Sequence, residues 1–136
     1  MKSLTVAAAL AALLVPLLAG ASCIEQPEPG KWVNVDPAAR SLTRIEVRFV
    51  CQDMVINGKL YPPGAPWYIQ AFGVEAAAQR MASGHIYAIF DQGSAKRTVY
   101  AKMSESRPGQ LWVYTWTDFT DPNRADSGAH DWFKRE

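Results

Sequence analysis

The sequence predicts an all-β protein: an antiparallel up-and-down β-barrel or barrel-like sandwich of about eight strands, following a cleaved signal peptide. Short segments that alternate apolar and polar residues recur along the chain, separated by Gly, Pro, Asn and Asp. No long segment has the 3.6-residue apolar period of an amphipathic helix. With 49% hydrophobic residues and a formal net charge of +1, the chain is neither disordered nor a nucleic-acid binder driven by bulk charge.

The first 21 residues have the features of a signal peptide. Lys2 supplies the positive start, an apolar run follows from Leu4 to Ala19, and Ala19-Gly20-Ala21 is a small-x-small cleavage site. The run is too short for a good membrane span. We therefore expect residues 1–21 to be removed and residues 22–136 to form one periplasmic or secreted domain without a membrane span.

Cys23 and Cys51 are the two cysteines of the chain. In an oxidising compartment an even count favours a disulfide, which would close a loop of about 27 residues and stabilise the fold by about 3 kcal/mol. The alternative is a lipid anchor on Cys23 as the first mature residue. Gly20 stands where lipoprotein signals carry a Leu-like residue, which favours the Cys23–Cys51 bridge.

The first half of the domain begins with an extended leader over residues 22–30, which is followed by two strands. Residues 30–35 alternate, and Asp36-Pro37 caps a turn. Residues 44–51 show the cleanest alternation, with Ile45 and Val47 on the face opposite to Arg44, Glu46 and Arg48.

A hairpin and two further strands follow. Asn57-Gly58 is the dipeptide typical of a type I′ turn within residues 55–60. The Pro-rich residues 61–66 cannot lie in a central strand. Residues 67–72 alternate again. Residues 74–82 contain three alanines with helix propensity, but their position between strands favours a strand.

The second half predicts strands at residues 85–90, 97–103 and 111–119. Residues 121–128 form a polar loop of turn formers, and a short last strand starts at Trp132-Phe133.

Gly30-x-Trp32 on the first strand resembles the opening of calycins, the lipocalin and avidin barrels. In those families the Trp closes one barrel end and an Arg from the last strand packs over it. The resemblance implies that role for Trp32, with Arg135 as its partner.

The chain also resembles a family of small exported bacterial proteins without an assigned activity. The similar segments are residues 43–45, 67–73, 117–119 and 123–126. This chain has Gly73-Val74-Glu75-Ala76 where that family carries a Cys- and His-containing stretch, so the resemblance implies fold and export rather than activity.

Aromatic residues supply the candidate binding surface. Trp112, Tyr114 and Trp116 share one face of a strand whose opposite face is also apolar, and only one face can be core. The other then binds a small apolar or sugar-like ligand, with Trp67 and Tyr68 as further ligand-binding residues. The Pro-rich residues 61–66 are the expected neighbour of this site. The alternative is a packed barrel that contacts an envelope protein or acts as a structural domain.

Other chemistries are disfavoured. His130-Asp131 lacks a nucleophile motif, so we expect no enzyme, with a hydrolase as the remote third reading. Asp118, Asp121, Asn123 and Asp126 do not have EF-hand spacing and fit turn chemistry instead. We expect no metal, cofactor or nucleic-acid partner.

The intact mass of the mature protein tests the processing and the cysteine pairing. We expect a chain that begins at Ser22 and is two hydrogens lighter than its reduced form, because the Cys23–Cys51 bridge forms on export. A lipid-sized increment on Cys23, or two thiols that alkylate without reductant, would contradict this.

Overall fold

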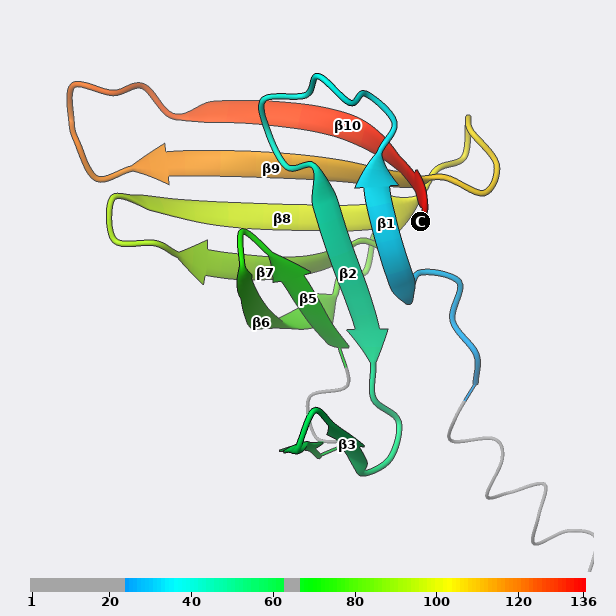
Figure 1. The fold of residues 1–136 in the computed structure, drawn as a ribbon. Coiled ribbons are helices and arrows are strands. Elements are labelled where there is room, and N and C mark those ends of the chain that lie inside the picture. The colour runs from blue at the N-terminus through cyan, green and yellow to red at the C-terminus, as the bar shows by residue number, and fades with distance from the viewer. Residues whose placement is uncertain (1–23, 63–66) are drawn as a thin grey trace, which may run out of the picture.

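The chain folds into a closed antiparallel β-barrel (Figure 1). A computed structural model describes residues 24–62 and 67–136. Eight strands form the barrel in the order β1-β10-β9-β8-β7-β6-β5-β2, and β3 and β4 form a separate hairpin. The strands are β1 (Gly30–Asn34), β2 (Arg44–Phe49), β3 (Met54–Ile56), β4 (Lys59–Tyr61), β5 (Trp67–Ala71), β6 (Val74–Arg80), β7 (Ile86–Asp91), β8 (Ala95–Met103), β9 (Leu111–Phe119) and β10 (Ser127–Arg135).

Strand alternation fills the barrel interior with side chains. Trp32, Ile69 and Phe133 point inward from three different strands and have no exposed surface. A zero exposed fraction leaves no water-sized void beside these residues. The core is therefore packed at the level of these side chains.

The strands expected from the sequence are present, including residues 74–80 as strand β6. The hairpin turn at Asn57-Gly58 has φ values of 51° and 77°, as a type I′ turn requires. Strand β6 prevails over the helix propensity of its alanines because it pairs with β5 along five residues and with β7 along three.

The expected end of the chain was wrong in one respect. The last strand does not start at Trp132 but at Ser127, and β10 is nine residues long. Residues 127–131 are polar or small and mostly exposed, so they lack the alternation that marks a strand. Pairing with β9 from Ser127↔Thr117 to Phe133↔Leu111 holds them in the sheet instead.

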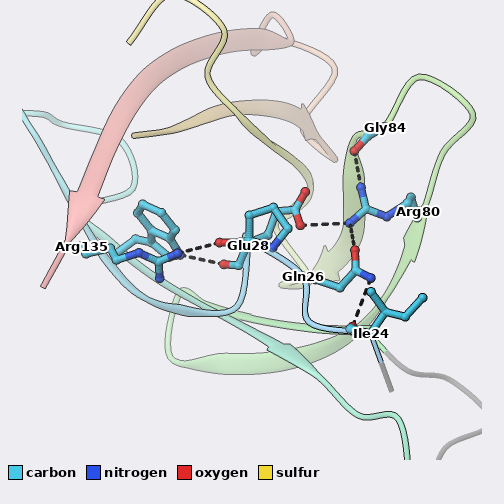
Figure 2. A network of polar contacts seen from close by, with 8 residues as sticks. Ile24, Gln26, Glu28, Arg80, Gly84 and Arg135 are labelled. Atoms are coloured by element: carbon cyan, nitrogen blue, oxygen red, sulfur yellow. Dashed lines mark hydrogen bonds and ion pairs between the residues drawn. The ribbon is translucent and has the colours of Figure 1, made fainter. Parts of the chain in front are cut away.

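The leader, residues 24–29, packs against one end of the barrel through Trp32 and Arg135. Figure 2 shows Arg135 on one side of the leader and the pair of Glu28 with Arg80 on the other. The Arg135 Cζ lies 4.3 Å from the centre of the Trp32 ring, which is the contact that the resemblance to calycins implied. The guanidinium also donates to the carbonyls of Pro27 and Pro29, and Trp32 Nε1 donates to the carbonyl of Glu28 at 2.9 Å.

Two further features fit the leader to this end. A Cβ on Gly30 would lie 2.6 Å from Arg135 Nη1, and its φ of 141° also favours glycine. The buried Glu28 carboxylate pairs with Arg80 at 3.0 Å, and the Arg80 guanidinium lies 4.9 Å from the Trp67 ring centre. The predicted Cys23–Cys51 bridge involves Cys23, which lies outside the described residues, as do the proposed signal peptide and residues 63–66. No cysteine within the described residues is free.

Truncating Trp32 should cost much of the stability of this domain. We expect Trp32→Ala to lower the free energy of unfolding by about 3–5 kcal/mol, because the ring is fully buried and carries the Arg135 contact. Denaturant unfolding measures this. Trp116→Ala is the matched control, since that ring is 39% exposed and its removal should cost about 1 kcal/mol or less. A loss below about 1 kcal/mol for Trp32→Ala would contradict the assignment.

Candidate functional site: an outer aromatic face

The side chains of β9 settle which of its two faces is core. Leu111, Val113, Thr115 and Thr117 are buried, whereas Trp112 and Tyr114 are half-buried and Trp116 is 39% exposed. Because side chains alternate along a strand, these three aromatic residues point out of the barrel. The surplus apolar face expected from the sequence is therefore the outer one.

Cross-strand pairing extends this face over four strands. Tyr87 pairs with Tyr100, Tyr100 pairs with Tyr114, and Tyr114 pairs with His130, so one row of rings crosses β7 to β10. The neighbouring row places Trp112 beside Trp132. We call the whole set the outer aromatic face; its members are His85, Tyr87, Tyr100, Trp112, Tyr114, Trp116, His130 and Trp132.

Most of these rings touch one another. The centres of the Trp112 and Tyr114 rings are 6.0 Å apart with planes 12° from parallel, and Trp112 stacks on His130 at 6.3 Å. Further contacts of 5.5 to 6.1 Å join His85, Tyr87, Tyr100 and Trp132 to the cluster. Such offset and edge contacts fix the rings relative to one another at low cost in side-chain entropy.

The face is hollowed and has polar groups at its margin. A shallow hollow of about 470 Å³ is lined by Met81, Ser83, His85, Tyr100, Trp112, Tyr114 and Trp116. Ser83 Oγ lies 2.8 Å from His85 Nδ1, and the Tyr87 hydroxyl donates to Gln79 at 3.2 Å. Burial, and then the charge of Lys102, lower the pKa of His85. His85 therefore presents a neutral ring to Trp112 at pH 7.

Gly128 lies on the outer aromatic face and contributes no side chain to it. It pairs with Trp116 across β9 and β10, and its missing side chain leaves the space that Tyr114 occupies. A Cβ at this position would collide with the Tyr114 hydroxyl and lie 2.8 Å from its Cζ and 3.3 Å from the Trp116 ring. The glycine therefore sets the positions of two rings of the face.

The other two predicted ligand-binding residues do not belong to this face. Trp67 is 5% exposed and lies in the core, because its position on β5 points inward. Tyr68 points outward, but β5 and β9 are four strands apart in either direction around the barrel. The five predicted ligand-binding residues therefore do not lie on one surface, and Trp67 and Tyr68 face opposite sides of β5.

The hairpin β3–β4 also lies on the wall away from the aromatic face. The Tyr61 ring packs against Tyr68 at 5.1 Å, and Lys59 Nζ lies 4.9 Å from its centre. A hydrogen bond to Glu75 raises the pKa of Tyr61. Tyr61 is thus on the far wall, away from Trp112 and Trp116, whereas residues 63–66 of the Pro-rich segment lie outside the described residues.

The residues considered for catalysis or metal binding make ordinary strand and turn contacts in the structure. His130 and Asp131 are successive strand residues, and Asp131 accepts a hydrogen bond from Ser41 at 2.7 Å. Asp121 and Asp126 accept from the backbone N–H groups of Asn123 and Phe119, which is turn chemistry. No group of three His, Cys, Asp or Glu side chains could hold a metal in residues 24–62 or 67–136. The same residues contain no helix long and apolar enough to cross a bilayer.

Comparison with known proteins gives no assignment. No protein-family model matches the chain, and neither curated proteins nor solved structures match it significantly.

Substituting Gly128 should rearrange the face without unfolding the barrel. We expect Gly128→Ala to displace Tyr114 and Trp116 and to alter the near-ultraviolet circular dichroism, because the new methyl group occupies the place of the Tyr114 hydroxyl. The free energy of unfolding should change by about 1 kcal/mol or less, since both rings can move into solvent. Ser127→Ala, one residue away, is the control and should leave the spectrum unchanged. An unaltered spectrum in Gly128→Ala would contradict the packing described.

Proposed function

We propose that the mature chain is an exported, non-enzymatic binding protein that holds a sugar-like ligand on its outer aromatic face. The observation that carries the proposal is the row of part-exposed rings across β7, β8, β9 and β10. Export is supported by the signal-peptide features of residues 1–21 and by the two cysteines.

The packing of the barrel favours an outer site over an inner one. The inward side chains near the barrel centre are fully buried, so a small ligand would have to displace core side chains to enter. The outer face, by contrast, exposes contiguous aromatic surface that monomeric soluble proteins seldom present without use. A ligand on this face meets rings that are already held in place.

The shape of the face favours a saccharide over a purely apolar ligand. Apolar ligands gain most in enclosed pockets that remove most of their surface from water. A shallow face covers only one side of its ligand. A pyranose ring suits this geometry, because its C–H face packs on an aromatic ring while its hydroxyls stay hydrated or reach polar groups. Ser83, His85 and the Tyr hydroxyls supply such groups at the margin.

Docking of an envelope protein is the alternative function, and the same observation favours it. Trp and Tyr are enriched at the centres of protein interfaces, where they form well-packed anchors. If the face binds sugars, a soluble saccharide alone binds to it. If the face docks a protein, a soluble saccharide alone does not bind.

Removing the two tryptophans of β9 separates binding from folding. We expect Trp112→Ala and Trp116→Ala to weaken binding of cellohexaose or chitohexaose by about tenfold or more, because each loses a stacking surface. Titration calorimetry measures this, and thermal melts should shift by only a few degrees. Tyr68→Ala is the matched control, since it removes an outward ring from the opposite wall.

Two results would overturn the proposal. If both tryptophan variants unfold, the rings are core and no binding face exists. If the folded wild-type protein binds neither these saccharides nor insoluble cellulose, chitin or peptidoglycan, the sugar function fails and protein docking is the function left for the face.

A further inference from the structure

Strand β10 continues as a sheet edge after its partner β1 has ended. It pairs with β9 from Ser127 to Phe133, but with β1 only from Phe133 to Arg135. The segment Ser127–Asp131 therefore has a neighbouring strand on one side alone. Figure 1 shows β10 running well past β1 along the long strands β8 and β9.

Two backbone hydrogen bonds identify which main-chain groups face this edge. Val35 N–H donates to the Trp132 carbonyl at 2.9 Å, and Glu136 N–H donates to the Lys31 carbonyl at 3.0 Å. The even-numbered residues of β10 thus turn their N–H and C=O groups toward β1. Because this direction alternates along an antiparallel strand, Gly128 and His130 aim theirs at the open edge.

These groups are accessible. Gly128 and His130 are both exposed. Within residues 24–62 and 67–136 no hydrogen bond reaches the main chain of either residue on that side. The segment Ser127–Asp131 contains no lysine, proline or bulge. Its charged residue, Asp131, lies at the end next to β1 and is hydrogen-bonded to Ser41 of the β1–β2 connection, so the open part of the edge is at Gly128 and His130.

A hollow of about 390 Å³ runs beside the edge. Ser127, Gly128 and Ala129 line one side, and Arg40, Ser41 and Leu42 of the β1–β2 connection line the other. Phe72, Arg97, Thr115, Thr117 and Phe119 complete the lining. Two arginines and no carboxylate line the hollow, and the Asp131 carboxylate lies next to it, because it accepts a hydrogen bond from Ser41. The two arginines and this one neighbouring carboxylate leave a formal excess of one positive charge.

We propose that this edge accepts an extended segment of a partner protein by strand addition, with an acidic side chain of that segment directed into the hollow. The main-chain groups of Gly128 and His130 supply affinity, and the hollow supplies specificity, as in other complexes formed by strand addition. Arg40 and Arg97 select a carboxylate over an ammonium group.

A single extended strand fits this space better than a second copy of the chain. In a two-fold pairing of two β10 edges, each copy would bring to the interface its own residues 40–42, which lie beside its edge. A lone peptide has no such segment. The inference goes beyond the proposed sugar-binding function, because it uses the main-chain groups of Gly128 and His130 and the hollow, whereas sugar binding uses the rings of the outer face.

Peptide binding with backbone-specific variants tests the inference. The probes are acetylated, amidated heptapeptides that alternate Thr and Val, with Glu or Lys placed at each position in turn. We expect at least one Glu peptide to slow hydrogen exchange at the Gly128 and His130 amides, and to bind at least about threefold more tightly than its Lys counterpart.

Two matched variants isolate the edge and its charge. His130→Pro removes the N–H at the edge, whereas His130→Ala removes only the ring, so the proline variant should bind at least about tenfold more weakly than the alanine variant. Arg40→Glu lies outside the strands and should abolish the preference for Glu peptides whether or not the proline variant folds.

The contrary outcomes are distinct. Equal peptide affinity of the folded His130→Pro and His130→Ala variants would overturn the inference, as would a panel in which no peptide protects the two amides. Protection that rises with protein concentration in the absence of peptide would show a second copy at the edge instead. Cellohexaose and chitohexaose titrations of Arg40→Glu should match the wild type, so failure at this edge is distinguishable from failure of the aromatic face.

Discussion

The contact between Arg135 and Trp32 lies at the seam where β10 pairs with β1 and the barrel closes. Strand β1 pairs with β10 over only three residues, which is a short seam for a closed sheet. The Arg135 guanidinium reinforces that seam, because it covers the Trp32 ring and binds two carbonyls of the leader. Gly30 permits this approach, since a side chain there would occupy the place of Nη1. Closure thus links two segments that are distant in sequence, residues 27–32 and the end of β10.

A closed and filled barrel limits where binding can occur. Large, fully buried side chains fill the centre of the barrel, so both candidate surfaces lie away from it, on the outer wall and beside the edge of β10. Both candidate surfaces lie on the side formed by the longest strands, β8, β9 and β10, which exceed β1, β2 and β5 in length. The excess length creates the broad aromatic wall and also leaves the edge of β10 without a partner.

Much of the fold was predictable because alternation and turn chemistry are local signals. The inward positions of β2 and β9, and the turn at Asn57-Gly58, follow from residues close together in sequence. The start of β10 was not predictable, because only pairing with β9 makes residues 127–131 a strand. The contact of Trp32 with Arg135 could be predicted only from the resemblance to calycins, since the residues around Trp32 do not show that a distant arginine covers its ring.

The candidate site was predictable only in part for a related reason. Trp112, Tyr114 and Trp116 share a face by alternation within one strand, which the sequence shows directly. Their neighbours Tyr87, Tyr100 and His130 join them through register between strands, and register is a property of the whole sheet. Trp67 and Tyr68 lie outside this surface, because Trp67 points into the core and β5 lies four strands away from β9.

Residues Gly128 and His130 belong to both candidate surfaces. Their positions on β10 put Gly128 beneath Tyr114 and His130 against Trp112, while their backbone groups face the open edge. A strand added at that edge would fix the backbone that supports these rings. The two sites are therefore adjacent. A strand bound at the edge would restrict the movement of the rings that contact β10. Any coupling must be reciprocal, so a ligand on the aromatic face would favour strand addition by the same factor by which the strand favours the ligand.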